Sequence, residues 1–222
     1  VYHKDIWRMI VETFKMIGDL FANLHIYMLN RIHKTSLKYR RVVHNNYRKF
    51  VMLVLVSTIP TGLIGIIGKG LVSAAGQTLL IPGICLLMTG VLLLIADTTR
   101  EGHKLPRQVT YKNGLLIGAA QGLATLPGLS RSGTTIAVCL LLGMDRRFAV
   151  KYSFILSIPA VLGAALLEVK DVIAEPVKAS QIGVYAIGMV FAAVVGYICI
   201  KTMLIVVKNK KFKYFSYYCF IV

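Results

Sequence analysis

The sequence predicts an all-α, polytopic integral membrane protein, and three observations lead to this fold class. Of the 222 residues, 56% are hydrophobic and the mean hydropathy is +0.69, values typical of membrane proteins. Several apolar runs approach the length needed to cross a hydrocarbon core of roughly 30 Å. Lysines and arginines, which give a net charge of +17, gather in short segments between these runs. We therefore expect one membrane domain over residues 1–222.

The first fifty residues are predicted to form an interfacial helix followed by a basic loop. Apolar residues recur at helical spacing within 1–30. Acidic Asp5, Glu12 and Asp19 lie on the opposite side, which indicates an amphipathic helix at the interface or against other helices. Residues 31–49 carry seven lysines and arginines and no acid, so they are predicted to be a cytoplasmic loop that fixes the orientation.

Four membrane spans and part of a fifth are predicted after the basic loop. The four spans are expected at 50–68, 79–96, 148–167 and 182–207. The apolar run 215–222 has eight residues, too few to cross a bilayer, so we expect it to be the start of a truncated span. Because the chain also begins with Val1 instead of methionine, we expect it to be a fragment.

Charge counts in the loops predict a topology whose alternation fails once. Lysine plus arginine number one in 69–78, four in 97–112, three in 144–151, two (against three acids) in 168–181 and four in 208–213. The loops rich in these residues are predicted to be cytoplasmic, and the two poor loops external. Residues 113–143 begin and end next to rich loops, so this segment is expected to turn round inside the membrane.

Residues 113–143 are therefore predicted to be a re-entrant helix–loop–helix. Helix-breaking Pro127 and Gly128 interrupt the apolar stretch. About ten residues remain between Gly133 and Asp145, or roughly 15 Å of helix, which is half a bilayer. The loop is expected near the midplane, where irregular backbone persists only inside protein or beside a wet cavity.

The residues of this loop are typical of an anion site. Arg131 would cost at least about 2.5 kcal/mol at membrane depth, and its guanidinium fork suits phosphate oxygens. The unpaired N–H groups at the start of the second half-helix point toward the same place. Gly128 and Gly133 permit close approach or positive φ. Hydroxyl donors and caps are offered by Ser130, Ser132, Thr134 and Thr135. A phosphate or diphosphate ligand is predicted, without the Gly-Lys-Ser/Thr ending of a Walker loop.

The membrane-depth residues limit the chemistry that this site can perform. All nine acids and five histidines lie in loops, at segment ends or in the amphipathic stretch, so the loop has no group for general acid–base catalysis and no carboxylate for a metal. A transporter or flippase for a lipid phosphate or another anion is an alternative, because broken helices with midplane sites are typical of transporters. A third reading is a non-functional product that inserts poorly. We expect no nucleic-acid partner, because no binding motif accompanies the charge.

The stretch from Ala120 to Ile136, with its Pro-Gly-Leu-Ser-Arg-Ser-Gly-Thr-Thr core, closely resembles the second motif region of undecaprenyl-diphosphate phosphatases, also called bacitracin-resistance proteins. The likeness continues through Gly143-Met-Asp-Arg-Arg-Phe-Ala and Ser157-Ile-Pro. It implies a bacterial inner-membrane hydrolase that converts undecaprenyl diphosphate to undecaprenyl phosphate, recycling the lipid carrier for cell-wall synthesis. It also implies a fold of inverted repeats and a site that opens outward.

The resemblance assigns roles to individual residues. Catalytic roles are implied for Arg131, which would bind the diphosphate, and for Ser130 and Thr135. Substrate-binding roles are implied for Gly128, Ser132, Gly133 and Thr134. The family enzyme is expected to use a divalent cation, Mg²⁺ or Ca²⁺. Its ligands belong to a Glu-rich first motif that precedes the position where this chain starts, so the chain is expected to be a partial form. The implied partners are the lipid diphosphate and membrane lipids, and the oligomeric state stays open.

Overall fold

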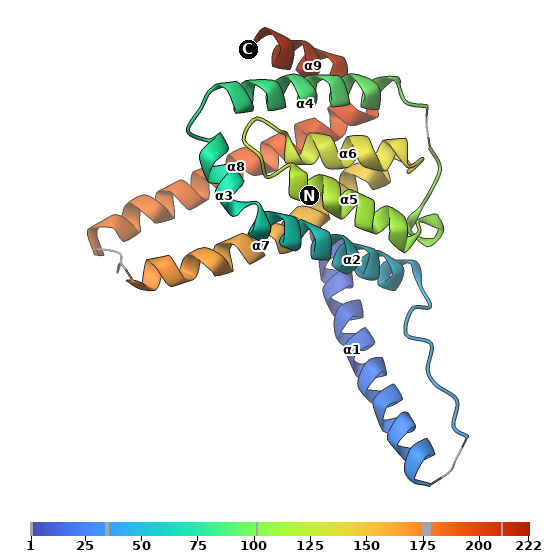
Figure 1. Cartoon of the computed structure of the whole chain (residues 1–222). Coiled ribbons are helices and arrows are strands. Elements are labelled where there is room, and N and C mark those ends of the chain that lie inside the picture. The colour runs from blue at the N-terminus through green and yellow to red at the C-terminus, as the bar shows by residue number, and fades with distance from the viewer. Residues whose placement is uncertain (1, 34–35, 101, 175–178, 210) are drawn as a thin grey trace.

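The computed structural model describes residues 2–33, 36–100, 102–174, 179–209 and 211–222, and within these ranges the chain is helical with no β-strand (Figure 1). The helices are α1 His3–Ile32, α2 Asn46–Ile67, α3 Lys69–Ala75, α4 Leu80–Thr98, α5 Tyr111–Leu123, α6 Arg131–Leu141, α7 Arg146–Ala174, α8 Ala179–Lys208 and α9 Phe212–Ile221, with a 3-10 turn η1 at Pro106–Gln108. The all-α class is confirmed.

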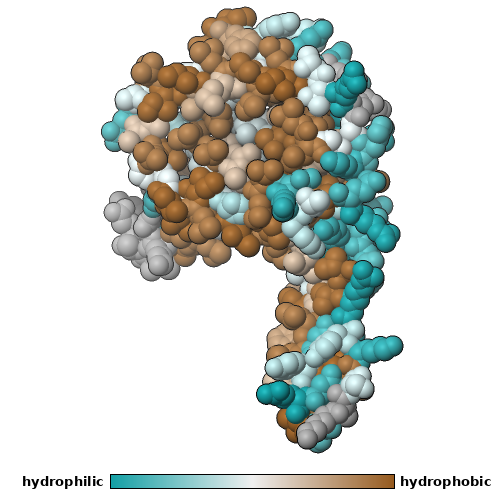
Figure 2. Space-filling view, turned by 45° about the vertical axis from the view of Figure 1, so that its right-hand side comes forward, coloured by the Kyte–Doolittle hydropathy of each residue, from teal (hydrophilic) through white to brown (hydrophobic). Residues whose placement is uncertain are grey.

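Among the residues that the structure describes, four helices are long and apolar enough to cross a membrane. They are Asn46–Ile67, Leu80–Thr98, Arg146–Val169 and Gly183–Val207. Apolar side chains cover most of the visible face of the body, whereas polar residues gather along one edge and on the α1 arm (Figure 2). Such an apolar exterior suits contact with lipid and supports the polytopic class.

Two predicted loops are shorter than expected because helix caps lie inside them. The loop at 31–49 ends early, since Asn45 accepts a hydrogen bond from the Arg48 N–H and α2 starts at Asn46. The loop at 144–151 is mostly the beginning of α7, because the Asp145 carboxylate accepts from the Phe148 N–H. The two helix caps therefore decide where α2 and α7 begin, a detail that counting charges does not give.

Helices α2 and α5 pack closely along a row of glycines. Gly114, Gly118 and Gly122 are spaced by four residues, which places them on one face of α5. A methyl group on Gly118 would overlap the carbonyl oxygen of Ser57 in α2. The Thr61 hydroxyl donates to the Gly118 carbonyl across this contact at 2.8 Å. Small residues therefore let the two backbones approach, as in other membrane helix pairs.

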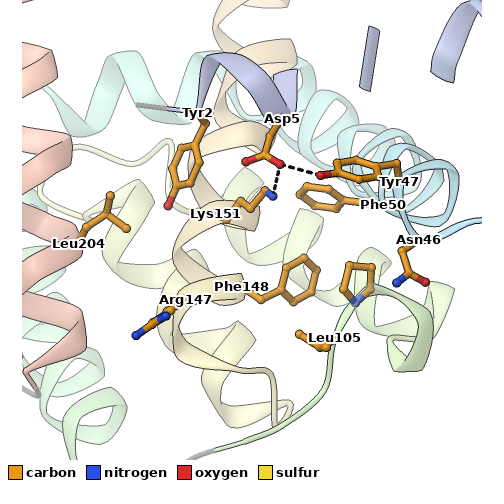
Figure 3. Close-up of a pocket in the computed structure, with 11 residues that line it drawn as sticks. Tyr2, Asp5, Asn46, Tyr47, Phe50, Leu105, Arg147, Phe148, Lys151 and Leu204 are labelled. Atoms are coloured by element: carbon orange, nitrogen blue, oxygen red, sulfur yellow. Dashed lines mark hydrogen bonds and ion pairs between the residues drawn. The ribbon is translucent and has the colours of Figure 1, made fainter. Parts of the chain in front are cut away.

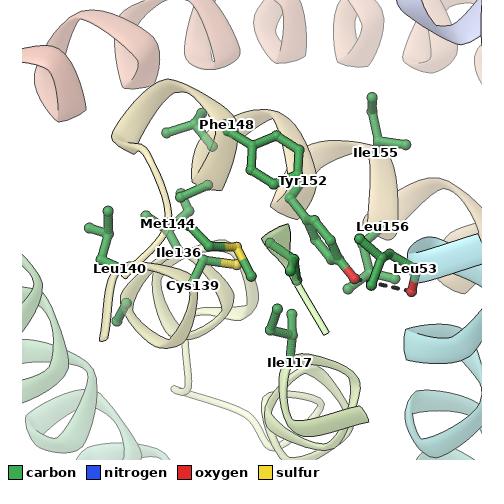
Figure 4. Close-up of a cluster of buried hydrophobic side chains, with 14 of the residues drawn as sticks. Leu53, Ile117, Ile136, Cys139, Leu140, Met144, Phe148, Tyr152, Ile155 and Leu156 are labelled. Atoms are coloured by element: carbon green, nitrogen blue, oxygen red, sulfur yellow. Dashed lines mark hydrogen bonds between the residues drawn. The ribbon is translucent and has the colours of Figure 1, made fainter. Parts of the chain in front are cut away.

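The core lies where α2, α5, α6 and α7 meet (Figure 4). Phe50, Phe148 and Tyr152 form an aromatic cluster with ring centroids 5.3 to 5.8 Å apart. The buried Tyr152 hydroxyl donates to the Leu53 carbonyl at 3.0 Å and contacts the Ser57 hydroxyl. The first half of α7 is thus held against α2, and it supports α6 from behind.

The basic loops come together at one end of the body. The Lys104 N–H donates to the Gly143 carbonyl, and the Asp145 N–H donates to the Lys104 carbonyl. Arg146 Nη2 donates to three carbonyls at the end of α4, the shortest bond being 3.0 Å to Thr99. We call residues 41–49, 97–100, 102–112, 142–151 and 211–213 the basic end. Helix α5 starts and α6 stops there, so the helix–loop–helix enters and leaves the body at the same end.

Helix α1 projects from the body and docks through its acidic side (Figure 1). Arg48, only 4% exposed, donates from Nε to Glu12 at 2.7 Å and also binds Asp19. Asp5 accepts from Tyr47 and pairs with Lys151 at 2.6 Å (Figure 3). The apolar stripe of α1 is left exposed, which favours the interfacial alternative. Arg48, one of the seven cations of the predicted basic loop, is therefore buried against the acids of α1.

Acid is expected to release α1 from the body. Hydrogen bonds from Arg48 lower the pKa values of Glu12 and Asp19 below their ordinary range. Because the lowered values belong to the docked state, the contact is fully stabilised above about pH 5 and weakens as the pH falls through the lowered values. Spin labels on α1 and α4 should report a longer distance at low pH. An Arg48→Gln variant should show that distance already at neutral pH, and an unchanged distance in both tests would contradict the role of this cluster.

Candidate functional site

The loop that joins α5 to α6 lies against the middle of α4. Residues 124–130 connect the two short helices, and Gly128 and Ser130, in the second half of this loop, are hydrogen-bonded to Thr89 of α4. Thr89 is nine residues from either end of α4, or about 14 Å along the helix. The loop between α5 and α6 therefore lies halfway along α4, a helix long enough to span the membrane. The sequence predicts this loop near the midplane of the membrane.

Thr89 holds the loop in place. The Thr89 hydroxyl donates to the Gly128 carbonyl at 3.1 Å and accepts from the Ser130 N–H at 3.0 Å. This threonine is 3% exposed, and the sequence reasoning missed it because one threonine in an apolar helix ordinarily bonds its own backbone. It also does so here, toward the Cys85 carbonyl at 3.0 Å. Only the packing of the loop on α4 reveals the second role.

Replacing Thr89 with valine should lower the activity of the site about tenfold to a hundredfold, because small displacements of a binding group have effects of that size. Valine keeps the shape but leaves the Ser130 N–H without its partner. Thr89→Ser restores the hydroxyl and should recover most of the loss. A kinetic comparison of both variants checks this, and equal losses in the two would show that the methyl group matters instead of the hydrogen bonds.

Both glycines of the motif serve the shape of the loop. Gly128 has φ of +88°, a conformation that glycine adopts without strain. A methyl group there would also overlap the carbonyl oxygen of Pro82 in α4. At Gly133 the added carbon would lie 2.9 Å from the Ser130 hydroxyl. The expected positive φ is thus found at Gly128, whereas a close approach of either glycine to a ligand stays a prediction.

Ser130 caps α6, which begins one residue later at Arg131. Its hydroxyl oxygen accepts from the Gly133 N–H at 3.1 Å, so its own proton is left to donate to a ligand. The second half-helix of the predicted helix–loop–helix therefore begins at Arg131. The positive end of the α6 dipole coincides with Arg131.

Arg131 is exposed, and no hydrogen bond or ion pair joins its guanidinium to another residue in the part of the chain that the structure describes. It lies in the first turn of α6, where backbone N–H groups lack helical partners. A free guanidinium next to a helix N-terminus is suited to bind phosphate oxygens. Ser132, the next residue, is half-buried.

The two threonines of the motif are buried. Thr135, 1% exposed, donates to the Arg131 carbonyl at 2.9 Å and contacts the hydroxyl of Ser153 in α7. These contacts join the first turn of α6 to α7. Thr135 therefore holds the backbone of Arg131 from the side that faces α7. Ser153 was missed by the sequence reasoning, which had no signal for it. The Thr134 hydroxyl has no hydrogen-bond partner among the described residues.

The loop does not form a divalent-cation site by itself. Its oxygen donors are hydroxyls and carbonyls, whereas Mg²⁺ and Ca²⁺ sites need carboxylates. Within the described ranges, no three His, Cys, Asp or Glu residues come together as metal ligands. We call residues 124–135 the Arg131 loop. A cavity of about 590 Å³ lies elsewhere, beside the Asp5–Lys151 ion pair (Figure 3), and no residue of the Arg131 loop lines it.

These features define a class of protein: a multi-pass membrane protein that presents an exposed, unpaired arginine at a helix N-terminus, on a broken helix pair packed against its apolar helices. The chain matches the family described as bacitracin resistance protein BacA over residues 1–222. It belongs to that family.

Relatives of the chain carry the name undecaprenyl-diphosphatase. One from Alkaliphilus metalliredigens (strain QYMF) is 37% identical over 218 residues, which cover 98% of this chain and 74% of the relative. One from Methanosphaera stadtmanae is 35% identical over 221 residues, covering 100% of this chain and 75% of the relative. One from Methanothermobacter thermautotrophicus is 42% identical over 172 residues, covering 75% of this chain and 93% of the relative.

Proposed function

We propose that the protein is an undecaprenyl-diphosphatase, which hydrolyses undecaprenyl diphosphate to undecaprenyl phosphate and inorganic phosphate. The observation that carries this proposal is the exposed, unpaired Arg131 at the N-terminus of α6. Family membership and the names of the relatives support the reaction. Nothing in the comparisons favours the transporter alternative.

In this proposal the terminal phosphate lies against the first turn of α6. Arg131 binds two of its oxygens, and the Ser130 hydroxyl donates to a third. Water attacks the terminal phosphorus, the bond from phosphorus to the bridging oxygen breaks, and undecaprenyl phosphate leaves with the electron pair. Negative charge grows during this step, and the guanidinium and α6 N-terminus stabilise it. Gly128, held against α4, keeps these donors at the right place.

The proposal extends to the cation and the membrane. A divalent cation, Mg²⁺ or Ca²⁺, is a requirement of the activity, with carboxylate ligands that come from outside the Arg131 loop. The membrane is the cytoplasmic membrane, with the basic end on the cytoplasmic side by the positive-inside rule. The loop then opens toward the outer side of the membrane, away from the basic end.

Phosphate release from undecaprenyl diphosphate in detergent tests this function. The relative from Alkaliphilus metalliredigens serves as the positive control. Release by this chain is expected to stop with EDTA and to return with added Mg²⁺ or Ca²⁺. If the relative releases phosphate while this chain releases none with either cation, the assignment of this activity to the chain is wrong. Release that persists in EDTA would contradict the cation requirement alone.

A further inference from the structure

A second cavity, of about 290 Å³, lies at the basic end and is lined by cationic residues. Its lining residues are Arg41, Val43, His44, Asn45, Asn46, Lys49, Arg107 and Tyr111. Three of these carry a permanent positive charge, and none is acidic. We call this cavity the basic pocket. None of its lining residues belongs to the Arg131 loop, and the proposed hydrolysis does not use it.

The charges of the basic pocket are not neutralised by the acids nearby. Within the described ranges, Glu12 and Asp19 form their ion pairs with Arg48 and other cations, and no ion pair involves Arg41, Lys49 or Arg107. Three like charges that share one small cavity repel each other, and an anion bound among them would relieve this repulsion.

The side chain of Lys49 is held over an aromatic ring. Its Nζ lies 3.4 Å from the ring centroid of Tyr111, a cation–π contact. This contact joins the first turn of α2 to the first turn of α5 and fixes one cation at the wall of the basic pocket. The charge arrangement is therefore built by tertiary packing and is more than a flexible basic loop.

Two helix N-termini add to the positive potential. Helix α2 begins at Asn46 after its cap Asn45, and α5 begins at Tyr111 after its cap Thr110. Asn46 and Tyr111 both line the basic pocket. The positive ends of two helix dipoles thus meet three cations, a combination that binds phosphate in many proteins.

We propose that the basic pocket binds a phosphate group, supplied either by the headgroup of an anionic membrane lipid or by a soluble phosphorylated anion. Arginine forks and a lysine at helix N-termini are suited to phosphate oxygens, and basic pockets between membrane helices bind anionic headgroups. The cavity has room for a headgroup phosphate. The basic pocket is lined mainly by charged and polar side chains, unlike the cavity of about 590 Å³, so we expect it to recognise the phosphate group and not an apolar tail.

The test compares two double variants of the full chain in an Arg131→Ala background, which removes the other anion site. One variant carries Arg41→Gln and Arg107→Gln in the basic pocket. The matched control carries Arg100→Gln and Lys112→Gln, two exposed cations that do not line it. Circular dichroism and gel filtration verify the fold of each. The soluble arm titrates inorganic pyrophosphate by calorimetry, and the lipid arm measures retained phosphatidylglycerol by native mass spectrometry.

The pocket variant should bind at least one probe about tenfold more weakly than the background, and the control should bind within about twofold of it. Loss in the lipid arm alone identifies a headgroup, and loss in the soluble arm identifies a soluble phosphorylated anion. Equal binding by the pocket variant and the control in both arms overturns the proposal. Because every protein here lacks Arg131, the result is independent of whether the chain hydrolyses undecaprenyl diphosphate.

Discussion

Replacing Arg131 with alanine is expected to lower phosphate release by about a hundredfold to a thousandfold, the usual effect of removing one donor that stabilises transition-state charge. The change removes the only guanidinium in the loop, while the exposed side chain contributes little to packing. The thermal unfolding temperature should therefore stay close to that of the unchanged protein. Steady-state phosphate release, measured beside the unfolding temperature, checks both parts.

Two further variants show whether the effect belongs to this guanidinium. Arg131→Lys keeps the charge but loses the bidentate fork, so intermediate activity is expected. Arg100→Ala removes an exposed arginine at the basic end and should leave release unchanged. Activity of the alanine variant at Arg131 within about threefold of the unchanged protein would contradict the assigned role, because loss of a transition-state donor is larger than that.

Replacing Gly128 with alanine should have the second largest effect, a loss of about a hundredfold in phosphate release. Alanine is strained at φ of +88°, and its methyl group would overlap the Pro82 carbonyl oxygen, which is backbone and cannot rotate away. The loop is expected to move off α4 and to break the contacts of Thr89 with Gly128 and Ser130. The donors at the start of α6 then lose their alignment.

Gly83→Ala is the matched control for the Gly128 variant. Gly83 lies next to Pro82 in α4, and an added methyl group there meets no atom within 4 Å. This control should keep both activity and stability. If the Gly128 variant keeps full activity as well, the loop tolerates the shift and the alignment argument is wrong. A loss of activity in both variants would indicate that α4 itself, and not the loop, is sensitive.

The residues of the Arg131 loop could be found from the sequence because each of them violates a local rule. A proline, two glycines and an arginine stand in an apolar stretch, and no neighbouring structure is needed to see that they do not belong in a plain membrane helix. Charge counts in the loops likewise depend on sequence alone. The charge counts predict that both ends of the helix–loop–helix lie on the same side. In the structure, Lys104 and Gly143, which flank these two ends, are in contact.

Other functional and structural contacts could not be found this way. Thr89 and Ser153 are ordinary hydroxyl residues in helices, and their partners are 41 and 18 residues away in the chain. In the sequence, Arg48 is one of seven cations in a basic segment. In the structure, its side chain is buried against the acids of α1. Nothing in the local pattern distinguishes these residues, because their roles arise from helices that meet only in the folded protein.

The sequence by itself determined the all-α membrane class and predicted where its apolar helices and the break before Arg131 lie, because hydropathy, charge and helix-breaking residues act locally. Tertiary structure alone decided how that loop is held, which motif hydroxyls face inward and which cations stay unpaired. These properties depend on the distances between helices. The packing of α5 on α2 through Gly118, and of the loop on α4 at Thr89, sets those distances.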